Sequence, residues 1–157
     1  MLPIAAVLLL LVGVALMAVL LTTPNNTLVH DVTLDDNQVT HDSLNFSVNG
    51  LLPGQERGYT VNLKGTRSGN YAVSLEFVEK NEGALKNYID VTVRCGENER
   101  IYKLSELLGG TTVSITCKVT AAQPTVIQVI YTIPQEVGND AQNATADFVI
   151  NLTAEQI

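Results

Sequence analysis

The sequence predicts an all-β fold, a β-sandwich or jelly roll that follows an apolar N-terminal segment. Three observations predict it. Val, Thr, Ile, Leu and Asn are plentiful in the 157 residues, and β-branched side chains suit a pleated, half-buried surface. Apolar and polar residues alternate in many short runs. Polar turns separate these runs, and this succession is typical of an antiparallel sandwich.

The apolar N-terminus can be interpreted in three ways. Leu2–Leu21 is apolar almost throughout, and about 20 helical residues suffice to cross a bilayer as an anchor. A secretory signal peptide is the second interpretation, with cleavage after Ala15 or Ala18, although the usual basic start is missing. A buried core helix is the least favoured, because no polar residues mark a second face. We therefore expect residues 1–23 to be a signal peptide or transmembrane anchor and residues 24–157 to be an exported β-sandwich domain.

In the first half of that domain, the sequence pattern predicts four strands. Pro24 ends the apolar segment within a polar linker, and residues 28–34 then alternate loosely. The next three strands carry an apolar side chain at every second position, and polar loops with Gly or Pro separate them. Their apolar rows are Leu44, Phe46 and Val48, then Tyr59, Val61 and Leu63, then Val73, Leu75 and Phe77.

The second half predicts five strands and two short helical turns. On the last strand Phe148, Ile150 and Leu152 alternate with polar residues, so we expect them to face the core. The helical turns are expected at 84–88 and 105–108, and Gly109-Gly110 stops the second. The strands are expected at 90–95, 100–104, 112–120, 125–133 and 145–154.

The two cysteines fall at strand positions that alternation directs towards the core. Cys95 alternates in step with Val91 and Val93, and Cys117 with Ile115 and Val119. We predict a disulfide between them, which fits an oxidising compartment. Two buried free thiols are the alternative. No Cys-x-x-Cys spacing is present, so zinc is not expected.

The sequence gives little support to catalysis or nucleic-acid binding. The net charge of −7 argues against a nucleic-acid partner, which needs a basic face. His30 and His41 are each followed by Asp and could bind a metal if their strands paired, but a solvated strand face is the simpler interpretation. The acidic residues Asp31, Asp35, Asp36 and Asp42 lack EF-hand spacing. We predict no enzyme activity, no catalytic residue, no metal and no cofactor.

Three stretches resemble parts of the TasA/camelysin family of exported matrix-fibre proteins, and they occur along the chain in the same order as in that family. "TIPQEVGNDAQNATADFVINLTAEQ" (132–156) resembles the closing segment, in which a strand ends in Pro, a Gly-Asn turn follows and the last strand ends near Ala-x-Gln. "NGLLPGQERGYTVNLKG" (49–65) resembles the family's Leu-x-Pro-Gly loop with the strand after it. "RIYKLSELLGG" (100–110) resembles a third family region. The turn motif in this sequence is Gly138, Asn139, Asp140 and Gln142.

The resemblance implies a jelly-roll-like β-sandwich, preceded by the N-terminal apolar helix, that builds or anchors extracellular or cell-surface fibres. Assembly would be head to tail, with itself or related subunits, by donation of an N-terminal strand to a neighbour's sheet edge. Val19, Leu20 and Leu21 form the expected donor segment. The family's aromatic-rich motif at the cleavage site is replaced here by Val19–Pro24. If the helix stays uncleaved, a membrane-tethered binding or adhesion module is the alternative, and a surface metallopeptidase is a third.

Overall fold

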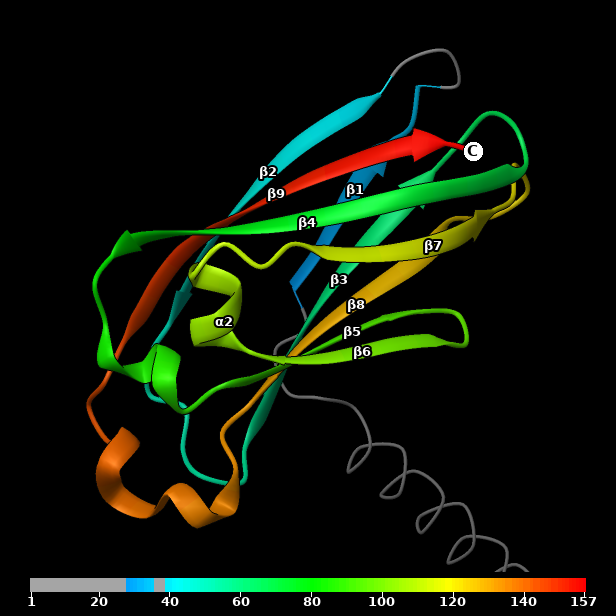
Figure 1. Ribbon diagram of the computed structural model, residues 1–157. Coiled ribbons are helices and arrows are strands. Elements are labelled where there is room, and N and C mark those ends of the chain that lie inside the picture. The colour runs from blue at the N-terminus through cyan, green and yellow to red at the C-terminus, as the bar shows by residue number, and fades with distance from the viewer. Residues whose placement is uncertain (1–27, 36–38) are drawn as a thin grey trace, which may run out of the picture.

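The computed structural model describes residues 28–35 and 39–157, which form two β-sheets packed face to face (Figure 1). The expected N-terminal helix, signal peptide or anchor, and the donor segment Val19–Leu21, lie outside the described residues. Within the described part, no helix combines the length and apolar character needed to cross a membrane. The prediction of an all-β sandwich is confirmed.

The sheets contain five and four strands. The larger sheet has the order β1-β3-β8-β5-β6, formed by Leu28–Thr33, Glu56–Lys64, Thr125–Thr132, Asp90–Cys95 and Asn98–Lys103. The smaller sheet has the order β2-β9-β4-β7, formed by Thr40–Val48, Ala146–Gln156, Gly69–Asn81 and Val113–Val119. Short helices connect some of them: η1 (Ala84–Asn87), α2 (Leu104–Leu108) and η2 (Gln135–Ala141).

Eight of the strands pair in a nested order. β2 pairs with β9, β3 with β8, β4 with β7 and β5 with β6, and every pair is antiparallel. Such nesting is what a long antiparallel hairpin gives when it is rolled into two sheets, as in a jelly roll. β1 is the one described strand outside this order, because it lies parallel to β3.

The core follows the predicted alternation. Phe148, Ile150 and Leu152 on β9 are all buried, as expected. The ring of Phe148 stacks on Phe46 of the neighbouring strand β2, with centroids 5.4 Å apart. Several expected boundaries were wrong by one or two residues. At one of them Leu104 begins α2 and does not extend the strand before it, because the Glu106 carboxylate accepts the backbone N–H of Lys103 and starts the helix there.

The predicted disulfide is present. Cys95 on β5 is bonded to Cys117 on β7, with their Cα atoms 5.8 Å apart. Both residues are buried. Because β5 and β7 belong to different sheets, the bond fastens the two layers to each other on the side of the sandwich where β6 and β7 form the edges.

Candidate functional site

The side of the sandwich formed by the edge strands β6 and β7 is partly blocked by polar and charged side chains. The side-chain amide of Asn98 donates to the backbone carbonyl of Thr116, 2.9 Å away, and so occupies part of the β7 edge. β6 itself carries exposed Glu99, Arg100 and Lys103. Charged side chains on an edge strand hinder pairing with another chain.

The opposite side is formed by the edge strands β1 and β2 (Figure 1). Four of the six side chains of β1 are exposed, and Val32 is the only buried one. Leu28 and Val29 are 65% and 63% exposed. β1 therefore pairs with the edge of β3 but buries little of its own side-chain surface.

Polar contacts of Asp31 hold β1 to β3. The Lys64 ammonium lies 2.5 Å from one Asp31 carboxylate oxygen, and the Asn62 amide donates to the other at 2.8 Å. These two hydrogen bonds, that of Lys64 first, lower the pKa of Asp31 below its ordinary value of 3.8. Beyond the strand, the Leu34 N–H donates to the Lys64 carbonyl at 2.8 Å.

One contact bridges the two sheets at this edge. His30 Nε2 on β1 lies 2.9 Å from Asp42 Oδ2 on β2, and both side chains are about one-third exposed. His41 points elsewhere, with Nδ1 3.2 Å from the Thr153 hydroxyl. The strands that carry the two His-Asp pairs considered for a metal lie in different sheets and do not pair, and the contact between them joins His30 of the first pair to Asp42 of the second. In the described part of the chain, no three or more His, Cys, Asp or Glu side chains are grouped so as to hold a metal ion.

A pocket of about 360 Å³ opens where β2, β3 and β8 approach the start of β1. Its walls are largely aromatic and apolar. The Phe46 ring meets Tyr59 edge-on at a centroid distance of 4.6 Å and Tyr131 at 5.9 Å. The lining includes Leu28, Phe46, Val48, Arg57, Tyr59 and Tyr131.

One polar group of this pocket, the Tyr131 hydroxyl, is unsatisfied by the described residues. The Tyr131 hydroxyl is buried and makes no hydrogen bond to any residue that the structure describes. Burial, and then the neighbouring Tyr59, raise the pKa of Tyr131 well above its ordinary value of 10.0. Burial and then the charge of Asp42 also raise the pKa of Tyr59. Both phenols therefore stay neutral and can donate hydrogen bonds at neutral pH.

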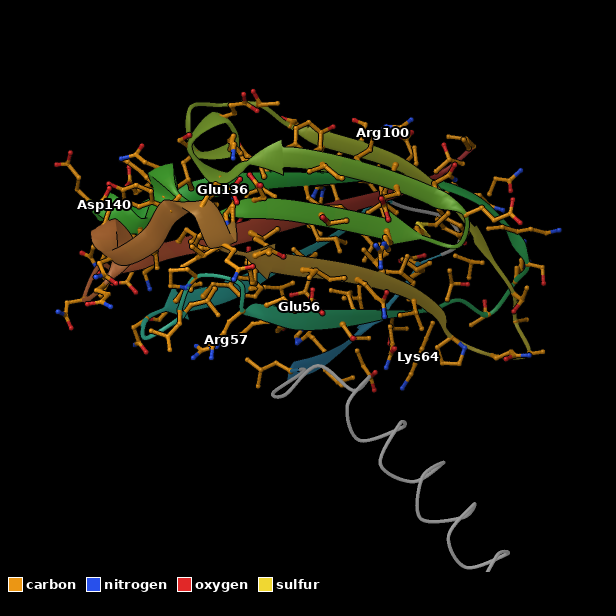
Figure 2. The ribbon with its side chains drawn as sticks, turned by 90° about the horizontal axis from the view of Figure 1, so that it is seen from below. Glu56, Arg57, Lys64, Arg100, Glu136 and Asp140 are labelled. Carbon is orange, nitrogen blue, oxygen red and sulfur yellow. A yellow bond between two sulfur atoms is a disulfide. The ribbon has the colours of Figure 1, made fainter. Side chains whose placement is uncertain are left out.

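Arg57 supplies the positive charge at the pocket. It continues the inward row of β3 that contains Tyr59, and it is half-buried. No hydrogen bond or ion pair links its guanidinium to another described residue. Figure 2 shows Arg57 on the β1 side of the sandwich and Arg100 on the far side. Sequence reasoning missed this site; the available signal was an arginine at an inward-facing strand position.

The predicted turn motif lies away from the pocket. Gly138 has φ +63° and joins two short helical turns in η2, at the end of the sandwich opposite the C-terminus (Figure 1). The Gln142 amide donates to the Asn139 side-chain carbonyl at 2.9 Å, and Asp140 is exposed. The Gly54 N–H donates to the Ile133 carbonyl at 2.7 Å, so two of the stretches that resemble fibre proteins meet here.

The chain matches no protein-family model and no curated protein. Among solved structures, it is similar to the pre-peptidase C-terminal domain of collagenase from Bacillus anthracis, with 11% identity, a TM-score of 0.38 and coverage of 85% of this chain and 100% of that chain. It is similar to PliG, a periplasmic inhibitor of g-type lysozyme from Aeromonas hydrophila, with 7% identity, a TM-score of 0.40 and coverage of 83% and 100%. It is also similar to the C-terminal CBM6 of LamC from Zobellia galactanivorans, with 15% identity, a TM-score of 0.35 and coverage of 74% and 99%.

These likenesses are too distant to carry a functional argument. None of the three proteins is a TasA/camelysin protein by name, so the resemblance found in the sequence stays a prediction. The fold and site define a disulfide-linked β-sandwich whose two sides differ in their edge strands. The side of β1 and β2 carries a parallel strand with one buried side chain and an aromatic pocket.

Proposed function

We propose that this protein is an exported structural protein that assembles head to tail by donating β1, with the residues before it, to the β3 edge of a neighbouring copy. The observation that carries the proposal is the position of β1 outside the nested pairing of the other eight strands. The Cys95–Cys117 disulfide supports an oxidising, extracellular location. The proposal assigns no enzymatic activity to the domain.

Exchange of β1 is energetically accessible because the strand buries so little. Val32 is its single buried side chain, and an identical strand from a neighbour would restore the same hydrogen bonds to Tyr59–Lys64. Exchange of an identical element between copies is a low-cost route to association, and a head-to-tail contact that does not close yields a filament. The predicted donor residues Val19, Leu20 and Leu21 precede β1 and would move with it.

The second candidate is the membrane-tethered extracellular binding module. The half-open aromatic pocket favours it, because a small, mostly apolar cavity with a few polar groups is the usual form of a ligand site. In this case β1 would remain on its own β3, and the N-terminal segment would hold the domain at the membrane.

Two neighbouring substitutions test assembly. Val32→Asp would place a charge at the buried anchor of β1, whereas Thr33→Asp would place it at an exposed position next to it. We expect the natural protein and Thr33→Asp to form filaments in electron micrographs, and Val32→Asp to remain monomeric by light scattering with an intact disulfide. If the natural exported protein stays monomeric at high concentration, the fibre function is wrong and the binding module takes its place.

A further inference from the structure

We infer that the pocket between β2, β3 and β8 binds a small amphipathic carboxylate, with its apolar or aromatic body against Phe46 and Tyr59 and its carboxylate on Arg57. This site goes beyond the proposed assembly; Leu28 of β1 contributes to its lining, and an identical β1 from a neighbouring copy would supply the same side chain. The cavity volume of about 360 Å³ lies within the range of roughly 300–1,000 Å³ that is usual for small-molecule sites.

Arg57 is the residue that defines the charge of the ligand. Of the nine Lys and Arg residues, Lys64, Lys86, Arg94 and Lys103 are ion-paired with a carboxylate. The remaining ones, except Arg57, are exposed to solvent; they are Arg67, Lys80, Arg100 and Lys118. Arg57 alone is half-buried without an ion pair to another described residue.

A half-buried cation without a counterion loses hydration and gains no charge partner, so an anion that enters the pocket compensates it. A carboxylate matches the planar guanidinium because it accepts two parallel hydrogen bonds. The protein as a whole carries a net charge of −7, so it does not attract anions in general. The local cation inside an apolar pocket therefore selects a molecule with both an apolar part and a carboxylate.

Tyr131 gives a second, independent reason to expect a ligand. Its hydroxyl is a buried donor without a partner among residues 28–35 and 39–157, and buried polar groups in folded proteins are nearly always hydrogen-bonded. Tyr131 lines the same pocket as Arg57. A ligand oxygen that reaches the buried hydroxyl would satisfy it, while the rings of Phe46 and Tyr59 would cover the ligand's apolar face.

The test compares 3-phenylpropanoate with its neutral amide, 3-phenylpropanamide, by NMR titration of the full-length protein, with the backbone amide of Gly58 as the reporter in the pocket. The carboxylate should shift the Gly58 signal and bind at least about tenfold more tightly than the amide, since charge-assisted hydrogen bonds are the stronger ones. Arg57→Gln should abolish this preference. Arg100→Gln, a change of an exposed arginine on the far side, should leave it unchanged (Figure 2).

Tyr131→Phe should weaken binding of the carboxylate about fivefold without lowering the melting temperature, because the hydroxyl has no partner to lose. Equal affinities for the carboxylate and the amide would overturn the inference, and so would an unshifted Gly58 signal at millimolar probe. Filament formation is read separately by electron microscopy. Arg57→Gln should not affect it, so failure of one proposal leaves the other standing.

Discussion

His30 on β1 and Asp42 on β2 lie 2.9 Å apart, from Nε2 to Oδ2, and link the edge strands of the two sheets. Asp31 of the same strand contacts Lys64 on β3, so two polar side-chain contacts hold a strand that has one buried side chain. Both contacts are at least partly exposed to solvent. Besides its backbone pairing with β3, β1 is therefore held by side-chain contacts that a change of residue or pH can remove without disturbing the core.

Removal of the His30–Asp42 contact between the two sheets should loosen β1 selectively. Because both partners are about one-third exposed, we expect the Asp42→Ala substitution to weaken β1 docking by no more than about 1 kcal/mol, or up to about fivefold in local opening. Hydrogen exchange at the Leu34 amide, which donates to Lys64, measures this opening. The control is His41→Ala, which removes a histidine outside the bridge. Equal exchange in both variants would mean that the bridge does not hold β1.

Acid should release β1 through Asp31. The pKa of this carboxyl is lowered in the folded state, so its contribution is fully present above the ordinary value of 3.8 and is lost as the pH falls through the lower folded value. The protection of the Leu34 amide against hydrogen exchange, relative to an unfolded chain at the same pH, should therefore fall below about pH 4, before the jelly roll unfolds. Asp31→Asn should exchange faster at neutral pH and show less pH dependence. An unchanged pH profile in this variant would exclude Asp31 as the responsible group.

Loss of the disulfide should destabilise the whole domain. Cys95 and Cys117 are 22 residues apart in the sequence, and opening a loop of this size should lower the free energy of unfolding by roughly 3 kcal/mol. Denaturant titration of the Cys95→Ser/Cys117→Ser double variant measures the loss. Mass analysis of the natural protein without reductant should show two hydrogens fewer than the reduced chain, and two thiols that react with an alkylating agent in the unfolded, unreduced protein would contradict the bond.

Substitutions on the two faces of β9 should differ in their cost to stability. Phe148 is fully buried and its ring contacts those of Phe46, Phe77 and Tyr131, so Phe148→Ala should cost roughly 3–5 kcal/mol. Thr153, on the opposite face of β9, is half-buried, and Thr153→Ala should change stability by less than about 1 kcal/mol. Thermal or denaturant unfolding provides the comparison. Similar small effects at both positions would mean that β9 is not a core strand.

The sequence predicted the strands well because alternation reports directly which side chains face inward. Phe148 and Cys117 were both placed correctly in this way. Alternation does not report which strand lies beside which, so the parallel pairing of β1 with β3 could not be derived. The kink at Gly138 was also beyond the pattern, since a polar run does not specify the backbone angles of the turn it forms.

The pocket was missed for a related reason. It forms where strands distant in the sequence meet, and its cation, Arg57, comes just before the apolar row that marked the strand at 59–63. A charged residue at the start of a strand is most simply interpreted as solvent-exposed. Its half-buried position depends on the packing of β2 and β8 around it, which no single segment of the sequence encodes.

A cysteine cross-link between β1 and β3 tests the exchange of β1 most directly. Val29 and Thr60 are register partners on the outer face of the sheet, and the two native cysteines are already bonded to each other. Val29→Cys and Thr60→Cys are made as separate single variants, mixed under conditions of assembly and oxidised. If β1 is donated to the neighbouring copy, the mixture should give a covalent dimer of the two variants on a non-reducing gel, whereas either variant alone should give little. Filaments that form without this mixed dimer would contradict assembly through β1.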